Sequence, residues 1–232
     1  MANKAFKFRI YPNAEQRTLF AKTFGCVRFV YNYYLKMKID KYNADKTSLN
    51  YTACANDMSK LKKSSDTAFL KEVDSVSLQQ SLRHLDSAFH NFFTQKKSGF
   101  PKFKSKKHNK KSYSTVCVNG NIQIIPGYIK LPKVGYVKLK QHRQIPENYK
   151  LKSATISQSA SGKYYVSVLF EYENQVQEIE PKTFLGLDFS MHELYKDSDG
   201  NESSYPRYYR QSEQKLKREQ RKLSLMQKGS KN

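Results

Sequence analysis

One predicted strand at the N-terminus lies far from every other predicted strand in the sequence. Residues 4–11 alternate between apolar and basic side chains, which predicts a strand with one buried face. The apolar positions are Phe6, Phe8 and Ile10, and the basic ones are Lys7 and Arg9. Because a lone strand is not stable in water, this one is expected to complete β-structure formed much later in the chain. The intervening helices, 13–97, would then be an insertion into one β domain.

Helical periodicity dominates the inserted segment. Asn13 is predicted to cap the first helix, with Gln16 in the capping-box position. Apolar residues keep helical spacing through residue 35, but Gly25 is expected to break or kink the run. Two helices joined tightly at Gly25 would resemble a helix-turn-helix, and an ordinary helical hairpin explains the pattern equally well. Further helices are predicted at 51–63, 66–72 and 75–97, the last one capped by Gly99.

A lysine-rich run follows the helices and contains no acid. A solvated segment is the ordinary interpretation of such a run. Here Phe100, Pro101 and Phe103 interrupt the charge, and predicted structure lies on both sides, which favours a nucleic-acid-binding loop that contacts phosphates. The candidate binding residues are Lys96, Lys97, Lys102, Lys104, Lys106, Lys107, Lys110 and Lys111.

The pattern then changes to short strands separated by glycine and proline turns. Strands are predicted at 115–118, 122–125, 128–131, 135–139, 151–158 and 163–171. Their close spacing suggests a small barrel or sandwich, so the fold class is α+β. The polar, acidic residues 174–182 resemble a linker into the next strand.

The overall charge restricts the partners of this chain. Lysine and arginine outnumber aspartate and glutamate by 42 to 20, which gives a net charge of +22 and favours a polyanion, most commonly nucleic acid. No apolar run is long enough to span a bilayer, and the N-terminus lacks a signal-peptide pattern. The three cysteines, Cys26, Cys54 and Cys117, form no metal-binding pattern and are expected to be reduced thiols of a cytoplasmic protein.

A short apolar run at 184–190 delivers one acidic residue, Asp188, and a hairpin-like segment at 193–200 follows it. In so basic a chain, this placement suggests a metal-binding carboxylate that faces nucleic acid, although a structural aspartate at a strand end explains it too. Metal-dependent phosphodiester cleavage needs several carboxylates. The acids that follow are Glu193, Asp197, Asp199, Glu202, Glu213 and Glu219.

Ordinary structural roles explain several of these later acids. Asp197 and Asp199 are better explained as turn formers. Glu213 and Glu219 lie on a basic helix predicted at 207–228, where charge pairing explains them. That helix has only a thin apolar edge, which is typical of a polyanion-binding helix or one that lacks a partner. Its candidate binding residues are Lys215, Arg218, Arg221 and Lys222.

Four segments, in this order, resemble the TnpB family, the OrfB-type proteins of bacterial insertion sequences, which are related to type V CRISPR nucleases. The first is Phe8-Arg9-Ile10-Tyr11-Pro12-Asn13 with Gln16, and the second is the run from Gly99 to Lys106. The third is the hairpin 153–167, and the fourth joins Gly186-Leu187-Asp188 and Asp199-Gly200 to the helix 212–224. Each motif alone is weak, but the ordered set covers essentially the whole chain.

The resemblance implies a domain plan. Residues 1–12 would supply the first strand of a wedge-like β-barrel, and 13–97 a helical recognition insertion. The basic loop would be 98–111, the rest of the barrel 112–180, and the start of a RuvC-like domain of RNase H type 181–232. Asp188 would be its first catalytic aspartate and a Mg²⁺ ligand. The family binds a guide RNA and cuts DNA, which implies RNA and DNA partners and a place in the bacterial cytoplasm near the nucleoid.

Members of the family continue further and supply a catalytic glutamate, a four-cysteine zinc ribbon and a final aspartate. None of these can be located here, since no cysteine follows Cys117. The chain is therefore expected to be an N-terminal, catalytically incomplete part of such a nuclease, truncated inside the RuvC-like domain and without a zinc site. The alternative is a non-catalytic DNA- or RNA-binding module derived from the family. A ribosomal-type RNA-binding protein would suit the charge but not the order of strand, Asp188 and hairpin.

Overall fold

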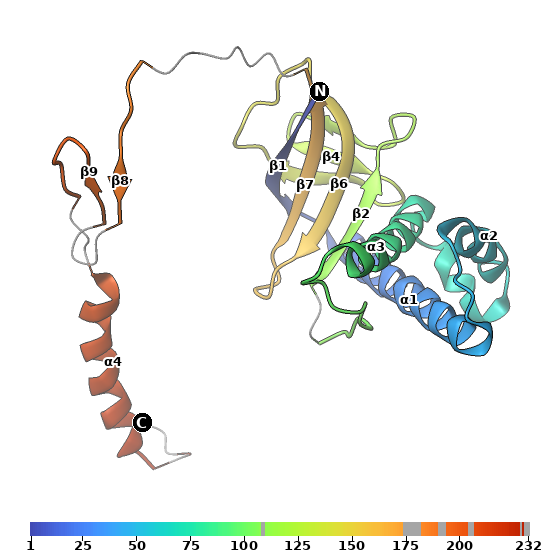
Figure 1. Ribbon diagram of the computed structural model, residues 1–232, viewed down its shortest axis with the longest axis horizontal. Helices are drawn as coiled ribbons and strands as arrows, with labels where there is room; N and C mark the ends of the chain where they lie inside the picture. Colours follow the sequence, from blue (N-terminus) through green and yellow to red (C-terminus); the bar gives the residue numbers. More distant parts are fainter. Residues whose placement is uncertain (108–109, 174–181, 190–193, 204–206, 228, 230–232) are drawn as a thin grey trace. The chain divides into compact units, whose positions relative to one another are not determined.

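The computed structural model describes residues 1–107, 110–173, 182–189, 194–203, 207–227 and 229 (Figure 1). The chain divides into two compact units, Met1–Gln175 and Val176–Asn232. The first unit holds one large sheet and most of the helices, and the second holds a small hairpin and one helix.

Seven antiparallel strands form the large sheet, in the order β2-β6-β7-β1-β5-β4-β3. Their bounds are Ala2–Tyr11 (β1), Lys111–Val116 (β2), Gln123–Ile125 (β3), Tyr128–Leu131 (β4), Gly135–Lys140 (β5), Lys150–Gln158 (β6) and Tyr164–Tyr172 (β7). The N-terminal strand β1 lies between β7 and β5, so it joins two groups of later strands. The expectation that the isolated first strand completes the later β-structure is confirmed.

The α+β class is confirmed, but the sheet is a curled half-barrel with an open strand order. β2 and β3 are its two edges in the described part of the chain, and they do not pair with each other. Side chains of a helix, and not further strands, cover the concave face of the open sheet. Phe20 and Phe24 of helix α1 (Ala14–Asp45) are buried in the same core as Phe6 and Phe8 of β1. A helix packed on one face of the sheet buries the apolar surface of that face, so the sheet need not close into a barrel.

A second core joins the helices to one another. It contains residues of α1, α2 (Tyr51–Leu61), the 3₁₀ helix η1 (Ser65–Lys71) and α3 (Ser75–Thr94). Its fully buried or nearly buried members include Val30, Tyr34, Leu35, Cys54, Met58, Leu70, Leu78, Leu82 and Leu85. Val27 packs against both cores, so α1 runs from the sheet core into the helical core.

The predicted break at Gly25 is wrong, because α1 is one helix of 32 residues. Both the helix-turn-helix and the helical hairpin with a junction at Gly25 are therefore excluded. A glycine inside a helix costs only about 1 kcal/mol relative to alanine, and burial of Phe24 and Cys26 on either side outweighs that. The predicted cap at Gly99 is also wrong, since α3 ends at Thr94 with Gln95 in an extended conformation.

The predicted capping box at the start of α1 is confirmed. The Gln16 backbone N–H donates to Asn13 Oδ1 at 2.8 Å, and Asn13 N–H donates to Gln16 Oε1 at 3.1 Å. Gln16 also donates from Nε2 to the carbonyl of Tyr136 on β5 at 2.8 Å. Gln16 thereby both caps the first turn of α1 and attaches that turn to β5.

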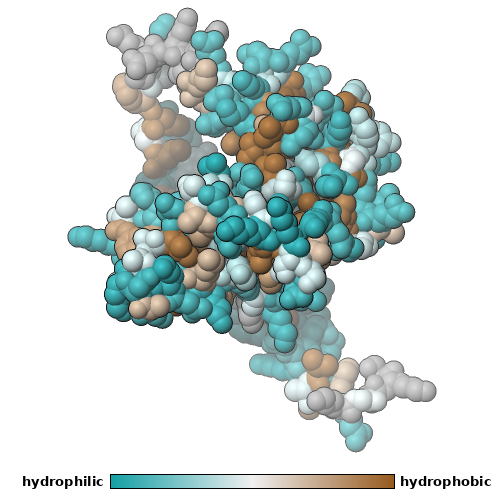
Figure 2. All heavy atoms as spheres, turned by 90° about the vertical axis from the view of Figure 1, so that its right-hand side faces the viewer, coloured by the Kyte–Doolittle hydropathy of each residue, from teal (hydrophilic) through white to brown (hydrophobic). Residues whose placement is uncertain are grey.

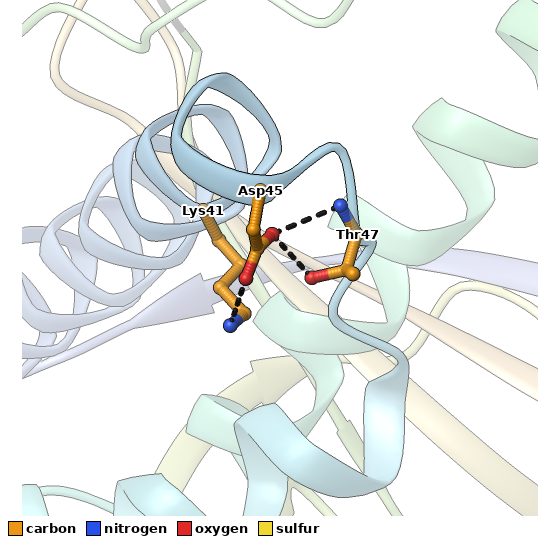
Figure 3. A network of polar contacts seen from close by, with 3 residues as sticks. All are labelled: Lys41, Asp45 and Thr47. Atoms are coloured by element: carbon orange, nitrogen blue, oxygen red, sulfur yellow. Dashed lines mark hydrogen bonds and ion pairs between the residues drawn. The ribbon is translucent and has the colours of Figure 1, made fainter.

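The other end of α1 stops at a polar network (Figure 3). Asp45 accepts hydrogen bonds from Lys41 Nζ at 2.5 Å and from the Thr47 hydroxyl and N–H at 2.5 and 2.9 Å. Lys41, together with Thr47, lowers the pKa of Asp45 to about 2. The pKa is lowered on folding, so any stability from this group is present above its usual pKa and is lost as the pH falls toward 2. Lys46, in the left-handed region at φ 59°, ends the helix.

Asp74 ties the helices to the sheet. Its buried carboxylate caps α3, accepting from the N–H groups of Val76 and Ser77 at 3.1 Å each. It also accepts from the hydroxyl of Thr115 on β2 at 2.6 Å. Thr115 is fully buried, so this hydrogen bond satisfies a hydroxyl that has no access to water.

All three cysteines are free thiols. Cys26 and Cys54 are buried in the helical core, and burial raises the pKa of Cys26 to about 11, with a further contribution from Glu72. These two match the expected buried, reduced thiols, whereas Cys117 is half-buried at the sheet.

The second unit contains β8 (Leu187–Asp188), β9 (Lys196–Asp197) and α4 (Tyr208–Ser224). β8 and β9 pair antiparallel, and Asp188 lies opposite Lys196. Apolar side chains around β8 are exposed: Phe184 at 82%, Leu187 at 63% and Phe189 at 76%. The predicted linker at 174–182 lies almost wholly outside the described residues.

On the face of the molecule shown in Figure 2, hydrophilic side chains cover most of the surface and hydrophobic ones emerge in patches. None of the described helices is both long and apolar enough to cross a membrane.

Replacing Gly25 by alanine tests the continuity of α1. Gly25 lies inside the helix, and an added Cβ would meet no atom within 4 Å. We expect Gly25→Ala to raise the free energy of unfolding by about 0.5–1 kcal/mol, measured by urea denaturation, because alanine restricts the unfolded chain. A turn at Gly25 would instead make the substitution destabilising.

A double-mutant cycle tests the Asp74 contact. Asp74→Ala removes the α3 cap and leaves the Thr115 hydroxyl unpaired, so we expect a loss of roughly 2–4 kcal/mol in unfolding free energy. Thr115→Val removes the hydroxyl and keeps the side-chain volume. The pair should show a coupling of about 0.5–3 kcal/mol. The exposed Asp66→Ala is the control and should change stability by less than about 0.5 kcal/mol. Additive effects of the two substitutions would contradict a direct contact.

Candidate nucleic-acid interface

The outer face of the large sheet carries basic and tyrosine side chains in alternation. Phe6, Phe8 and Ile10 of β1 are buried in the core, so the intervening side chains of that strand point to the other face. Strand register places similar residues beside them: Arg9 lies opposite Tyr165 of β7 and Lys140 of β5, and Tyr11 lies opposite Lys138. We call this set the sheet patch, and it consists of Lys7, Arg9, Tyr11, Lys138, Lys140 and Tyr165.

Contacts within the sheet patch hold its cations against aromatic rings. Lys7 Nζ lies 5.0 Å from the centroid of the Tyr165 ring. The Arg9 guanidinium lies 5.2 Å from the Tyr11 ring and 5.6 Å from the Tyr165 ring. Its Nε is buried and has no hydrogen-bond partner among the described residues. Cations placed over tyrosine rings on the outer face of a sheet suit the bases and phosphates of a nucleic acid.

The sheet patch was not among the sequence-based candidates. The alternation at 4–11 did place Lys7 and Arg9 on one face, and this is the signal that could have found it. The neighbouring residues come from strands more than a hundred positions away, and only the observed register brings them together.

Helix α1 anchors the predicted basic loop. Asn32 Nδ2 donates to the Lys104 carbonyl and Asn32 Oδ1 accepts from the Lys104 N–H, both at 2.8 Å. Phe100 packs edge-on against Phe89 and Phe92 of α3 at 5.6 and 5.4 Å between ring centroids. The apolar residues inside the lysine run therefore attach the loop to the helices.

Lys104 differs from the other predicted loop lysines. Its Nζ lies 3.8 Å from the centroid of the Tyr31 ring, and burial lowers its pKa. The pKa of His84 on α3 is lowered by burial and, to a smaller extent, by the positive charge of Lys104. Lys104 thus has a structural contact of its own, and its part in phosphate binding stays a prediction.

The other predicted loop lysines are exposed. They are Lys96, Lys97, Lys102, Lys106, Lys107, Lys110 and Lys111. Their ammonium groups are available to phosphates, and Lys111 begins β2 at the edge of the sheet. Binding by these lysines stays a prediction as well.

Asp188 is exposed on β8. Around it, Ser198 Oγ accepts from Gly186 N–H at 3.1 Å, and Ser198 N–H donates to the Gly186 carbonyl at 2.8 Å. No three His, Cys, Asp or Glu side chains come together as metal ligands in the described part of the chain. Glu193 lies outside the described residues.

Four of the later acids, Asp197, Glu202, Glu213 and Glu219, have local contacts in the structure. Asp197 accepts from the N–H groups of Asp199 and Asn201 and from Asn201 Nδ2, which lowers its pKa and confirms it as a turn former. Glu202 pairs with Lys196. On α4, Glu213 pairs with Lys217, and Glu219 contacts Arg218 and Lys222, as charge pairing predicted.

The predicted basic residues of α4 are all exposed. Lys215 and Arg221 form no ion pair within the described residues, whereas Arg218 and Lys222 share Glu219. The helix has no buried residue, and Leu216 and Leu223 are 57% and 69% exposed. Its thin apolar edge is therefore uncovered among the described residues.

Comparison with known families gives one domain match. Residues 1–47 match the OrfB family described as a helix-turn-helix domain. In the structure these residues contain β1 and the whole of the continuous helix α1, so the name does not describe their local geometry.

Several proteins are similar in sequence. The chain is 33% identical over 230 residues to a Streptomyces pristinaespiralis protein named for RNA-guided DNA endonuclease activity, and 31% identical over 229 residues to InsQ of Escherichia coli, which is named in the same way. Each alignment covers 99% of this chain and 56% of the relative. The chain thus spans little more than half the length of these relatives.

A shorter relative and a solved structure complete the comparison. The virulence protein VsdF of Salmonella dublin is 41% identical over 115 residues, which cover 46% of this chain and 96% of VsdF. A CRISPR-Cas12f ternary complex aligns with 94% of this chain and 54% of its own, at 12% identity and a TM-score of 0.41.

The ordered motifs, the OrfB domain match and the similarity along 99% of the chain agree with one another. The resemblance of the chain to the TnpB, or OrfB-type, family of insertion-sequence proteins is therefore confirmed.

Proposed function

We propose that this chain is the nucleic-acid-binding part of an RNA-guided DNA endonuclease, with guide RNA and DNA as its ligands. The sheet patch is the observation that carries the proposal. Its six positions are all basic or tyrosine, and cation–π contacts hold the side chains of β1 and β7 in place. A rigid surface that offers both charge and ring faces binds nucleic acid through phosphates and stacked bases.

The net charge supports the same proposal. An excess of 22 positive charges raises the local concentration of any polyanion and speeds its association. The exposed lysines at 96–111 extend the basic surface beyond the sheet. Their contacts would position a nucleic acid, whereas specificity requires contacts to bases.

We propose that Asp188 is the first carboxylate of a RuvC-like site and that the 232-residue chain does not cleave DNA by itself. Mg²⁺, held by several carboxylates, would supply an activated water and charge stabilisation in such a site. In this chain, Asp197 accepts turn hydrogen bonds, and Glu202, Glu213 and Glu219 are in ion pairs. These four acids thus have other contacts, which favours binding without catalysis.

Charge removal from the sheet patch tests the binding proposal. We expect binding of a labelled RNA of about 20 nucleotides, followed by fluorescence anisotropy, to weaken steeply with salt. Lys7→Gln combined with Lys138→Gln should reduce the slope of log affinity against log salt by about 1.4–1.8, or about 0.7–0.9 for each phosphate that the chain no longer neutralises.

A matched control removes the same kind of charge elsewhere. Lys71 is exposed at the end of η1, so Lys71→Gln should leave the slope nearly unchanged. Binding that is insensitive to salt would contradict the proposal. Equal effects of the patch and control substitutions would show that the patch has no special part in binding.

A cleavage assay tests the role of Asp188. We expect the RNA-loaded chain, in Mg²⁺, to leave matching DNA uncut over hours, because Asp188 has no grouped carboxylate partner among the residues that the structure describes. The Asp188→Asn variant should give the same gel pattern as the unaltered chain. Cleavage that depends on Asp188 would refute the prediction of catalytic incompleteness.

A further inference from the structure

The exposed side of α1 carries a groove that is separate from the sheet patch. Gly25, Arg28, Phe29, Tyr33 and Lys36 recur at helical spacing along one side of the helix. Phe103, from the basic loop, lines the same groove. Its volume is about 400 Å³, within the range of about 300–1,000 Å³ found for ligand-binding clefts.

Aromatic rings form much of the groove. The rings of Phe29 and Tyr33 are stacked, with centroids 5.8 Å apart and planes 28° apart. Phe69 of η1 packs edge-on against Phe29 with ring centroids 5.4 Å apart, and this contact restricts the Phe29 ring. Tyr33 and Phe103 are 38% and 56% exposed, which leaves ring surface open to a ligand. Exposed, fixed rings of this kind are stacking platforms for bases.

Two cations lie on the same side of the helix as these rings. Arg28 and Lys36 are eight residues apart, which separates their backbones by about 12 Å along the helix axis. Neither forms an ion pair within the described residues. A ligand that combines a flat ring with negative charge on either side of it complements this arrangement.

Two features keep the groove open and in shape. Asn32 binds the backbone of Lys104 through two hydrogen bonds, which holds the adjacent Phe103 beside α1. At Gly25 an added Cβ would meet no atom within 4 Å, so the groove has free space above the helix backbone there. The groove is therefore formed before any ligand binds.

We propose that this groove receives an unpaired base of single-stranded RNA, which stacks on Tyr33 and Phe103 while Arg28 and Lys36 contact the flanking phosphates. The proposal rests on the proposed function, that the chain binds RNA. Bases within a duplex are paired and stacked on each other, whereas single-stranded RNA can turn a base outward into a pocket. The groove would thus be a site for an unpaired segment of the bound RNA.

Anisotropy of a labelled oligouridine of about 16 nucleotides, with the full chain, tests this site. Phe103→Ala removes a stacking ring, and Gly25→Leu fills the groove while keeping the helix. Each should weaken binding by about tenfold and leave the salt slope unchanged. Arg28→Gln should lower the slope by about 0.7. Phe93→Ala, which removes a 76% exposed ring outside the groove, is the matched control and should bind like the unaltered chain.

A second measurement reports on stacking directly. The chain has no tryptophan, so Tyr33→Trp introduces a single indole into the groove, and its fluorescence can be excited apart from that of the tyrosines. Its emission should be quenched as the oligouridine binds, in parallel with the anisotropy. Circular dichroism and the thermal midpoint of each variant show whether it is folded, and Gly25→Leu keeps the proposal testable if Phe103→Ala unfolds.

The outcomes separate the groove from the general proposal. Salt-dependent binding that is the same in Gly25→Leu, Phe103→Ala and Phe93→Ala, without tryptophan quenching, would overturn the groove and leave the proposed function intact. No binding of any RNA by the unaltered chain would overturn the proposed function. Tighter, equally groove-dependent binding of oligothymidine would overturn the assignment to RNA.

Discussion

The continuity of α1 is the constraint on which the rest of the first unit depends. At 1.5 Å per residue its 32 residues extend for about 48 Å, and they pass through both hydrophobic cores. Phe20 and Phe24 fill the face of the sheet, and Val30, Tyr34 and Leu35 organise the other helices. The helical insertion is therefore joined to the sheet by a shared rigid element, not by a pair of linkers.

Polar contacts then fix what the shared helix brings together. Gln16 bonds the start of α1 to β5, Asp74 bonds the start of α3 to β2, and Asn32 bonds the basic loop to α1. Gln16 and Asp74 also accept hydrogen bonds from backbone N–H groups at the starts of their helices, so each of these two residues performs a local and a long-range task. A surface supported in this way loses little conformational freedom on binding, which increases affinity for a given set of contacts.

The sequence predicted the elements better than their junctions. Alternation and turn residues located six of the seven strands of the large sheet closely, whereas the strand predicted at 115–118 overlaps only the end of β2. Asn13 with Gln16 correctly marked the start of α1. The predicted break at Gly25 was wrong because the low helix propensity of glycine is outweighed by the buried side chains on both sides of it. The predicted cap at Gly99 was wrong because α3 ends at Thr94, five residues earlier. The chain then leaves the helix, and Phe100 packs back against Phe92 of α3.

The candidate sites were less predictable because they join distant parts of the chain. The lysine run was visible as composition, but its attachment through Asn32 spans 72 positions. The sheet patch needs the register of β1 with β5 and β7, and no local pattern specifies that register. Spacing along α1 could have suggested its cationic and aromatic side, but not that Phe103 lies beside it.

The contrast between the two units bears on the role of Asp188. The sheet patch and the groove are complete within the first unit, where every contributing strand and helix is packed on a core. Asp188 lies instead on a two-strand hairpin whose apolar neighbours are 63% and 76% exposed at Leu187 and Phe189. A hairpin of this size is marginally stable in water by itself, so the position of its carboxylate depends on whatever covers those side chains. The proposed binding surfaces thus consist of residues of the first unit alone, whereas the proposed role of Asp188 depends on a hairpin whose apolar side chains are exposed.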